Sequence, residues 1–541
     1  MKTISSSGSF KDFTNDNFIY IDKTKTIYNL LKTKKRVFIS RPRRFGKSLT
    51  LDTIGTLFEK GVEPYFKGTW IYDKWDESTY PVLRLSFLRY SVSDVEEFKR
   101  RLVKDISNFA KNNNVKNYEE DPTPDGSIDS LLESLKGEQK HVVILIDEYD
   151  CQLTANINNT ELYDSFREVM RSFYGCIKDK EAVKFMFVTG VTRLKDVSIF
   201  SVGSDISDIT NASVYSQMIG FTRDEIKKFY IDYLKLAASY ENNISVEDVT
   251  DDEVEAILNK LAENYDGYCF DEDYEKKVFS TWSVNSFFQT MYDKKKVQYG
   301  EYWYDNGGLP SILVNYLKTH ELNIFEYLDK DKILKVTNDD FKNPTSLTSI
   351  NQNVLMCQTG YLTLKSDLYK TSTVALSIPN GEIYKALNRL LANNIFKGNT
   401  DVTDDEGVNI FEIGSAEDII RLLNSALNSV SYDNYPLTSE SSVQNMIKIY
   451  LLGARQNVLS EVHEAKGRAD LIVELTDRRI VFEFKYAQNE IEAKTKLNEV
   501  IEQIKTRDYG NILPKKKQLL RIAAVFNAEP KVRAFTLYTA V

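Results

Sequence analysis

The sequence predicts an α/β protein: an N-terminal region built on a mostly parallel sheet, a helical middle region, and a second α/β domain at the C-terminal end. Three observations support this fold class. Short apolar runs alternate with helix-like segments through residues 1–220, the pattern turns helical from Thr222 onward, and a strand–turn–strand pattern followed by an amphipathic helix lies near the end of the chain. A chain of 541 residues with 42% apolar residues can fill several cores. We therefore expect domains at residues 1–220, 221–428 and 429–541.

The N-terminal region has the alternation that is typical of a parallel sheet covered by helices. Apolar runs predict strands at residues 37–40, 82–87, 142–146 and 183–188, and the segments between them predict helices at residues 49–59, 95–111, 128–136 and 161–173. Residues 112–127, which contain Pro122, Pro124 and Gly126, are expected to form a surface loop. Helices are expected at residues 223–240 and 245–265 of the middle region, which we assign to packing and relay rather than to chemistry.

A phosphate-binding loop is predicted where the first strand meets the first long helix. The segment reads Arg41-Pro42-Arg43-Arg44-Phe45-Gly46-Lys47-Ser48. In such a loop, backbone N–H groups and a helix N-terminus hold anionic oxygens, Lys47 reaches the β- and γ-phosphates, and Ser48 ligates Mg²⁺. Position 41 carries arginine where the pattern G-x-x-x-x-G-K-[ST] has glycine. We expect Arg41, Arg43 and Arg44 to add cationic groups near the phosphates, and Gly46 to allow the close backbone approach.

Two carboxylates follow the third apolar run and suggest a partner for this loop. Asp147 and Glu148 end a run of buried character, where open α/β sheets bind ligands. Asp147 would hold the Mg²⁺ shell and Glu148 would orient the attacking water. After the next run, Thr189 would sense the γ-phosphate and Arg193 would supply positive charge. The alternatives are a solvated acidic turn and an ordinary polar strand end. The two motifs at this separation favour ATP or GTP binding.

Composition limits the remaining function classes. The net charge of −9 argues against a surface that coats nucleic acid, but residues 440–541 hold 17 Lys and Arg against 13 Asp and Glu, so a nucleic-acid role would lie there. Four scattered cysteines predict reduced thiols and a cytoplasmic protein, and three histidines favour a hard cation held by oxygens. No apolar run is long enough to span a membrane, and the N-terminus shows no export signal.

A second candidate site lies in a predicted hairpin at residues 467–475 and 479–486. Alternation along the second strand places Glu483 and Lys485 on one face, with Asp470 of the first strand at about the same height. Two converging carboxylates make a Mg²⁺ site, and Lys485 would position water or offset charge on phosphorus. The alternative is an exposed Glu–Lys face of an edge strand. The expected amphipathic helix at residues 490–505, with Gln503 near its end, favours the metal site.

Seven motifs spread over nearly the whole chain carry a family resemblance. They are Tyr20-Ile21-Asp22-Lys23-Thr24, Arg41-Pro42-Arg43-Arg44-Phe45-Gly46-Lys47-Ser48, Leu145-Ile146-Asp147-Glu148-Tyr149-Asp150, Val197-Ser198-Ile199-Phe200-Ser201, Tyr265-Asp266-Gly267-Tyr268, Gln358-Thr359-Gly360-Tyr361-Leu362 and Gly467-Arg468-Ala469-Asp470. On these motifs the chain resembles the bacterial AAA-ATPase-like family that carries a PD-(D/E)XK nuclease-like domain at its C-terminus. The resemblance implies a P-loop NTPase fold of the AAA-like type joined to a restriction-endonuclease-like fold.

The resemblance also implies roles for individual residues. Nucleotide roles fall to Lys47, Ser48, Asp147 and Glu148, and nuclease roles fall to Asp470, Glu483 and Lys485. Such nuclease folds often use one more acidic residue on the helix before the hairpin. The helix expected at residues 443–452 contains Gln444 and no acid, and Glu440 lies just before it.

Three functions therefore stay open at this point. The first is an ATPase coupled to a Mg²⁺-dependent nuclease that acts on DNA, in defence or in DNA processing, with ATP and Mg²⁺ as cofactors and with homo-oligomers as one option for assembly. No residue identifies itself as an arginine finger. The second is an ATP-driven switch whose C-terminal domain binds nucleic acid or protein without cutting. A scaffold with both sites degenerate is a third reading.

Overall fold

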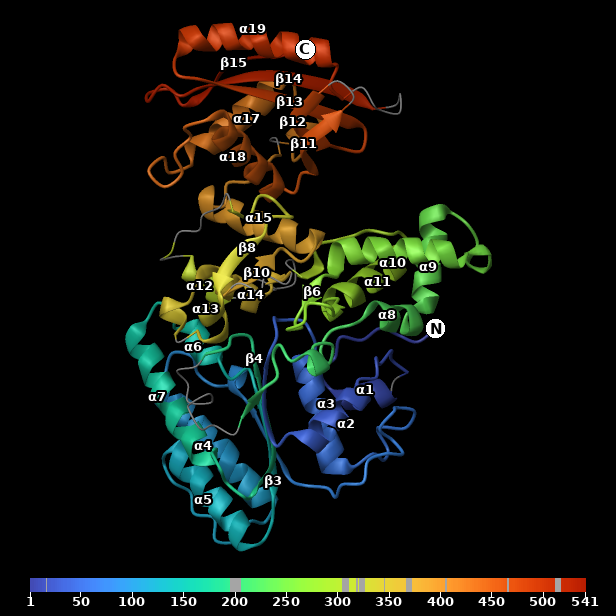
Figure 1. Ribbon diagram of the computed structural model, residues 1–541, viewed down its shortest axis with the longest axis vertical. Helices are drawn as coiled ribbons and strands as arrows, with labels where there is room; N and C mark the ends of the chain where they lie inside the picture. Colours follow the sequence, from blue (N-terminus) through green and yellow to red (C-terminus); the bar gives the residue numbers. More distant parts are fainter. Residues whose placement is uncertain are drawn as a thin grey trace. The chain divides into compact units, whose positions relative to one another are not determined.

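The computed structural model describes the chain except for residues 16, 195–205, 304–310, 318–319, 321–325, 345, 366–371, 404–405, 465–466 and 511–516. The resemblance motif at residues 197–201 lies outside the described residues. The chain forms two compact units (Figure 1): unit 1 comprises Met1–Leu322 and Lys330–Tyr384, and unit 2 comprises Asn323–Asp329 and Lys385–Val541. The expected boundary at residue 220 lies inside unit 1, and the one at residue 428 lies inside unit 2.

Unit 1 is built on a parallel sheet with the strand order β2-β3-β4-β1-β5. Its strands are β1 (Arg36–Ser40), β2 (Val82–Ser86), β3 (Val142–Asp147), β4 (Val183–Gly190) and β5 (Ser207–Asp208). The four predicted strands are confirmed, because buried apolar runs of this kind suit a sheet covered on both faces. Asp147 pairs in register with Ser86, and Ser40 pairs with Gly190. The carboxyl ends of these strands therefore meet at one edge.

The helices of the N-terminal region follow the predicted alternation. They are α1 (Phe10–Asn15), α2 (Thr24–Thr33), α3 (Lys47–Lys60), α4 (Val95–Asn112), α5 (Pro124–Gly137), α6 (Cys151–Ala155) and α7 (Thr160–Ile177). Helix α3 packs on strands β2, β3 and β4, and α4, α5 and α7 pack together. The prediction of a loop over residues 112–127 is wrong at its end. Thr123 caps α5 by accepting a hydrogen bond from the Gly126 N–H, and Pro124 occupies the first turn, where a missing N–H costs nothing.

The middle of the chain is helical but more finely divided than predicted. It holds α8 (Arg223–Phe229), α9 (Ile231–Asn242), α10 (Asp251–Tyr265) and α11 (Thr281–Lys294). The single helix expected at residues 223–240 is broken at Tyr230, whose ψ of 19° departs from helical values. The helix expected from residue 245 begins at Asp251 instead, because Thr250 and Glu253 form a capping box there.

The rest of unit 1 contains small sheets and short helices. Strands β6 (Tyr268–Cys269) and β7 (Lys277–Val278) pair with each other, and β8 (Leu334–Thr337), β10 (Thr373–Ser377) and β9 (Thr363–Leu364) form a second small sheet in that order. The helices are α12 (Ser311–Tyr316), α13 (Asn338–Lys342) and α14 (Gln352–Thr359), and α15 (Gly381–Ile395) continues into unit 2.

Unit 2 contains a five-stranded mixed sheet with the order β11-β12-β13-β14-β15 (orange to red in Figure 1). Its elements are α16 (Ile410–Ile413), α17 (Ala416–Asn428), α18 (Glu440–Gly453), β11 (Val458–Glu464), β12 (Gly467–Glu474), β13 (Arg478–Ala487), α19 (Glu490–Arg507), β14 (Gln518–Asn527) and β15 (Ala534–Ala540). Strands β13 and β14 are parallel and the other pairs are antiparallel. The predicted hairpin and the helix after it are confirmed.

In the part of the chain that the structure describes, every helix is too short or too polar to cross a bilayer. The four cysteines are unpaired.

Candidate nucleotide and nuclease sites

The loop between β1 and α3 has the conformation that a phosphate-binding loop needs. Gly46 has φ of 101°, a left-handed value that a glycine adopts at low cost. The Nζ atom of Lys47 donates hydrogen bonds of 2.9 Å to the backbone oxygens of Arg41 and of Pro42, so the lysine lies within the curve of the loop. Burial lowers the pKa of Lys47, and the carboxylates of Glu148 and Asp147 oppose this effect.

The structure brings the predicted carboxylates to this loop. Ser48 Oγ donates a hydrogen bond of 2.6 Å to Asp147 Oδ2, and Asp147 Oδ1 accepts the Glu148 N–H at 3.0 Å. Burial raises the pKa of Glu148, and Lys47 is the first group that opposes the rise. Lys47, Ser48, Asp147 and Glu148 therefore form one cluster, and the alternative of a solvated acidic turn does not describe it.

A cavity of about 510 Å³ opens on the loop. Loop residues 43–50 and Glu148 line one part of it. The remaining lining is mixed. Its apolar members are Phe13, Ile19, Ile21, Ile27, Leu88, Met218, Ile219, Phe221 and Trp282, and its polar members include Ser5, Ser6, Ser7, Lys23, Thr53, Thr281 and Asn285. A charged loop beside a partly apolar chamber of this volume suits a nucleotide, which has an anionic chain and a flat base.

Arg41 does not face this cavity. Its side chain is buried, its Nη1 donates to the backbone oxygens of Ser40 at 2.8 Å and Thr210 at 2.6 Å, and its guanidinium lies 4.1 Å from the ring centre of Phe270. Burial lowers its pKa to about 9. The prediction that Arg41 adds charge near the phosphates is therefore corrected: the side chain turns into the protein and joins the end of β1 to residues 208–216.

The other two arginines of the loop do line the cavity. Arg44 lies with its guanidinium carbon 4.0 Å from the ring centre of Trp282 and has φ of 73°. Arg43 receives a hydrogen bond at its backbone oxygen from Trp303 Nε1, at 3.3 Å. Of the three loop arginines, Arg43 and Arg44 are therefore the ones placed to meet an anion in the cavity.

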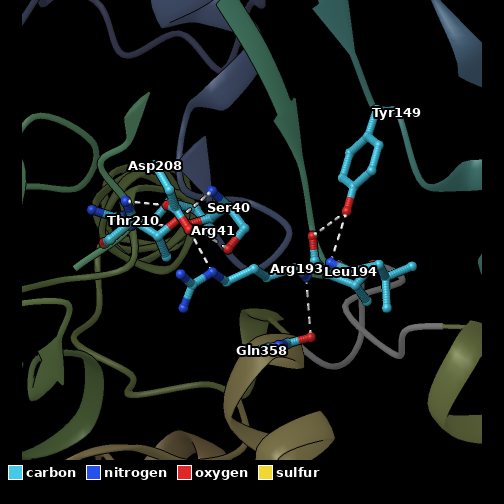
Figure 2. A network of polar contacts seen from close by, with 9 residues as sticks. Ser40, Arg41, Tyr149, Arg193, Leu194, Asp208, Thr210 and Gln358 are labelled. Atoms are coloured by element: carbon cyan, nitrogen blue, oxygen red, sulfur yellow. Dashed lines mark hydrogen bonds and ion pairs between the residues drawn. The ribbon is translucent and has the colours of Figure 1, made fainter. Parts of the chain in front are cut away.

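Thr189 lies near the end of β4 and Arg193 follows the strand, but neither is among the described residues that line the cavity. Thr189 is fully buried, and no hydrogen bond to its hydroxyl is found among the described residues. Arg193 forms an ion pair with Asp208, and its N–H donates to Gln358 Oε1 at 3.3 Å (Figure 2). A sensor role for Thr189 and a charge-supplying role for Arg193 stay predictions.

Asp150 is a structural residue of this site that the sequence reasoning missed. Its buried carboxylate accepts the N–H groups of Val191 and Thr192 and the Thr192 hydroxyl, at 2.6 Å for both Thr192 contacts. The Tyr149 hydroxyl donates to the Thr192 backbone oxygen at 3.1 Å. These bonds fix the turn after β4 against the carboxyl end of β3. The Asp147-Glu148-Tyr149-Asp150 run belongs to a motif of the family resemblance, and this could have drawn attention to Asp150. The motif by itself implied no role for Tyr149 or Asp150.

The second site lies at the centre of the sheet of unit 2. Leu471 pairs with Phe482, so Asp470 comes beside Glu483, and Asp470 Oδ2 accepts the Phe484 N–H at 2.8 Å. Glu483 is buried: Gln503 of α19 donates to its Oε1, and no hydrogen bond to Oε2 is found in the described part of the chain. Burial and then Asp470 raise the pKa of Glu483 to about 8. A buried carboxylate on an inner strand excludes the alternative of an exposed edge-strand face.

The hydrogen-bond donor to Glu483, Gln503, comes from α19 and is itself held in a small polar network. Gln503 Nε2 also lies 3.3 Å from the hydroxyl of Tyr509, and Arg507 Nη1 donates to the same hydroxyl at 2.8 Å. The sequence pattern places Gln503 near this site but gives no signal for Arg507 and Tyr509. The amide thus fixes one oxygen of Glu483 and leaves the other for a ligand.

Helix α18 differs from the sequence prediction at its start. It begins at Glu440 because Ser439 caps it, so Glu440 lies on the helix and not before it. Lys485 Nζ donates to Glu440 Oε1 at 3.1 Å, and Gln444 donates to the backbone oxygen of Asp470 at 3.1 Å. The helix therefore presents one carboxylate, already paired with Lys485, and one amide.

Both sites have the donor chemistry of a Mg²⁺ site with few protein ligands. Among the described residues no three His, Cys, Asp or Glu side chains converge as a ligand cluster. Mg²⁺ is often held by one or two carboxylates, with water and phosphate oxygens completing the shell. Ser48 with Asp147, and Asp470 with Glu483, fit this rule. The buried Oε2 of Glu483 fits it best, because a cation would satisfy an atom that the described residues leave unbonded.

Comparison with known proteins assigns both regions. Residues 6–200 match the family described as Predicted AAA-ATPase, and residues 438–535 match the PD-(D/E)XK nuclease superfamily. A relative from Azotobacter chroococcum mcd 1, described as an uncharacterized protein in the vnfD 5′ region, is 26% identical over 508 residues, or 92% of this chain and 90% of that protein. The crystal structure of Cdc6p from Pyrobaculum aerophilum aligns with 72% of this chain and 99% of its own chain, at 11% identity and a TM-score of 0.27. The chain thus joins an AAA-ATPase-like domain at residues 6–200 to a PD-(D/E)XK nuclease superfamily domain at residues 438–535.

Proposed function

We propose that the chain binds and hydrolyses ATP in the cavity of unit 1. The observation that carries this proposal is the hydrogen bond between Ser48 and Asp147, which joins a loop serine to a strand-end carboxylate 99 positions away in the chain. Lys47 leaves its two backbone partners for the β- and γ-phosphates, and Glu148 lines the same cavity and orients water. Ser48 and Asp147 would hold Mg²⁺, which would neutralise charge on the phosphates.

We propose further that unit 2 is a Mg²⁺-dependent nuclease that acts on DNA. The Oε2 atom of Glu483, beside Asp470, has no hydrogen bond among the described residues, and this supports the metal site. Lys485 lies on the same strand and would offset the charge that develops on phosphorus. Bound Mg²⁺ would polarise the phosphodiester and acidify its water. The basic balance of residues 440–541 and the unpaired cysteines agree with a nucleic-acid enzyme of a reducing compartment, which we take to be the cytoplasm.

One assay tests both proposals. Purified chain is incubated with single- and double-stranded DNA and RNA, in Mg²⁺ or EDTA, with and without ATP, beside Lys47→Ala, Glu483→Ala and the exposed-surface control Glu499→Ala. We expect Mg²⁺-dependent DNA cleavage that Glu483→Ala abolishes and Glu499→Ala preserves, and ATP turnover that only Lys47→Ala abolishes. Absence of cleavage from every substrate refutes the nuclease proposal.

A second function has one observation in its favour. Helix α18 offers Asp470 an amide from Gln444, and its one acid, Glu440, is paired with Lys485. These contacts suit a domain that binds nucleic acid without cutting. Salt-sensitive DNA binding without cleavage in Mg²⁺ or Mn²⁺ would support this function in place of the nuclease.

A further inference from the structure

The phosphate loop is held from outside by donors that belong to distant parts of unit 1. At the start of α11, Thr281 Oγ1 and the Trp282 N–H donate to the backbone oxygen of Arg44, at 2.9 and 3.3 Å. Trp303 Nε1 donates to the backbone oxygen of Arg43 at 3.3 Å. The carbonyls of the two arginines that line the cavity are thus fixed by two separate segments, and the peptide planes that present the loop N–H groups are fixed with them.

One buried carboxyl group ties these two segments together. Glu382 Oε1 accepts the backbone N–H of Trp303 at 2.7 Å, and Glu382 Oε2 is hydrogen bonded to Ser283 Oγ of α11 at 2.7 Å. The Glu382 residue is 2% exposed. One oxygen of Glu382 therefore binds the Trp303 segment and the other binds the start of α11, and these are the two segments that contact the loop.

Packing around the same point leaves the loop little freedom. Gly360 has φ of 94°, and a Cβ atom added to it would lie 2.8 Å from the Cβ of Pro42. The ring of Trp303 meets the ring of Tyr361 edge-to-face with centres 5.2 Å apart. A shift of the loop at Pro42 or Arg43 would therefore press on Trp303, whose own N–H is bound to Glu382.

We infer that Glu382 is a positioning residue for the phosphate loop and that it links the loop to helix α15. Glu382 is the second residue of α15, a helix whose residues 381–384 belong to unit 1 and whose remainder belongs to unit 2. Phosphates that fix the loop N–H groups also fix the carbonyls on the other side of the same peptides, and so fix Trp303 and the first turn of α15. This inference rests on the proposed binding of ATP. The continuous backbone of α15 would then connect the phosphate loop to residues beyond unit 1.

The test combines ATP affinity with hydrogen exchange on the full-length chain. Binding is measured with a fluorescent ATP analogue, and exchange is followed in the peptide that covers residues 381–395, with and without ATP. We expect ATP to slow exchange in this peptide about tenfold in the wild type, because local opening would have to disturb the loop contacts. Glu382→Ala should bind the analogue about tenfold more weakly and lose the protection.

Glu382→Gln is the matched variant that separates positioning from general packing. Burial raises the pKa of Glu382 to about 8, so its carboxyl is mostly protonated at neutral pH and offers one acceptor and one donor, as an amide does. Glutamine should therefore retain both ATP affinity and protection. Trp303→Phe should weaken binding through loss of the Nε1 donor, and the Glu382→Ala/Trp303→Phe double variant should bind no more weakly than the weaker single variant, since both act through one path.

The outcomes separate the inference from the function on which it rests. If the wild type binds ATP but residues 381–395 exchange at the same rate with and without it, the inference is overturned and ATP binding stands, with no variant needed. Full affinity in Glu382→Ala, or additive losses in the double variant, also overturns it. If the wild type binds the analogue no better than Lys47→Ala, ATP binding itself fails and the inference falls with it.

Discussion

Replacement of Arg41 by methionine tests whether the arginine of the loop works in the protein interior or at the phosphates. Methionine keeps most of the side-chain length and removes the guanidinium. The change deletes the hydrogen bonds of Nη1 to Ser40 and Thr210, at 2.8 and 2.6 Å, and the contact with Phe270 at 4.1 Å. Nothing that lines the cavity is altered.

The expected loss of stability in Arg41→Met is small but measurable, because the lost contacts are partly offset by the relief of burying a charge. Two hydrogen bonds from a charged donor contribute roughly 2 kcal/mol each, and a buried cation–π contact contributes about 2 kcal/mol. Against these, burial lowers the pKa of Arg41 from 12.5 to about 9, which corresponds to a cost of roughly 5 kcal/mol for the charged form. Removal of the guanidinium relieves that cost, so Arg41→Met should destabilise unit 1 by only about 1–2 kcal/mol. Arg41→Ala adds a cavity and should cost about 2 kcal/mol more.

Urea unfolding followed by circular dichroism, together with titration of a fluorescent ATP analogue, gives both readouts. The matched control is Arg43→Met, the same replacement two positions along, where the side chain lines the cavity. Arg43→Met should leave the unfolding midpoint of unit 1 within error and weaken nucleotide binding about tenfold, as loss of one cation near phosphate predicts. Arg41→Met should show the reverse pattern. If Arg41→Met keeps wild-type stability and binds nucleotide more weakly than Arg43→Met, the interior assignment is wrong.

The remaining predictions concern four other side chains. Lys47→Ala should abolish the ATP-dependent rise in melting temperature measured by differential scanning fluorimetry, because the lysine contributes the charge nearest the β- and γ-phosphates. Glu148→Gln should keep ATP affinity but lower the steady-state hydrolysis rate about 10²-fold or more, since the amide still lines the cavity but cannot act as a base. Because burial raises the pKa of Glu382 from 4.5 to about 8, the folded chain retains a proton that the unfolded chain has lost; its contribution to stability is complete below pH 4.5 and falls by about 1.4 kcal/mol per pH unit up to about pH 8. Urea unfolding at pH 5.5 and 7.5 should show this slope in the wild type and not in Glu382→Gln. Gln503→Ala should raise the Mg²⁺ concentration needed for half-maximal DNA cleavage about tenfold, because one oxygen of Glu483 loses its donor.

Each of these four has an outcome that contradicts it. An unchanged thermal shift in Lys47→Ala would place the nucleotide elsewhere, and loss of ATP affinity in Glu148→Gln would make that residue a binding group. Equal pH slopes in the wild type and Glu382→Gln would show that the carboxyl ionises normally. A Gln503→Ala enzyme with unchanged Mg²⁺ dependence but slower cleavage would show that the amide does not position the metal ligand.

The apolar runs of the sequence predict the central strands of the sheet in unit 1, because burial on both faces leaves a signal that needs no tertiary information. In the sheet of unit 2 the sequence predicts the β12–β13 hairpin, from alternation, and misses β11, β14 and β15. The nucleotide cluster could be predicted for a second reason. In a parallel sheet the carboxyl ends of the strands meet at one edge, so the residues that follow β1 and end β3 lie together there: Lys47, Ser48, Asp147 and Glu148. Asp470 and Glu483 followed from strand alternation and hairpin register.

The direction of a loop side chain leaves no such periodic signal. The partners of Arg41 include Thr210 and Phe270, far along the chain, so spacing near residue 41 could not show that the guanidinium turns inward. The break between α8 and α9 at Tyr230 also leaves no signal in the sequence, because the apolar periodicity of residues 223–240 continues across it. Glu440 was misplaced by the smallest margin, since a serine cap moves a helix start by only a few residues.

The loop can dispense with the usual first glycine because its backbone does not need one there. Within residues 41–48, positive φ occurs at Arg44 and at Gly46 and not at position 41. A side chain at position 41 is therefore free of backbone strain, and it extends the end of β1 into a buried anchor instead of crowding the phosphates. Gly46 keeps the left-handed conformation, while the carbonyls of Arg43 and Arg44 are held by Trp303 and by the start of α11. Hydrogen bonds from outside the loop thus hold its backbone in shape without further glycines. They also make the loop depend on segments more than 200 residues away, which is the dependence that substitution of Glu382 would expose.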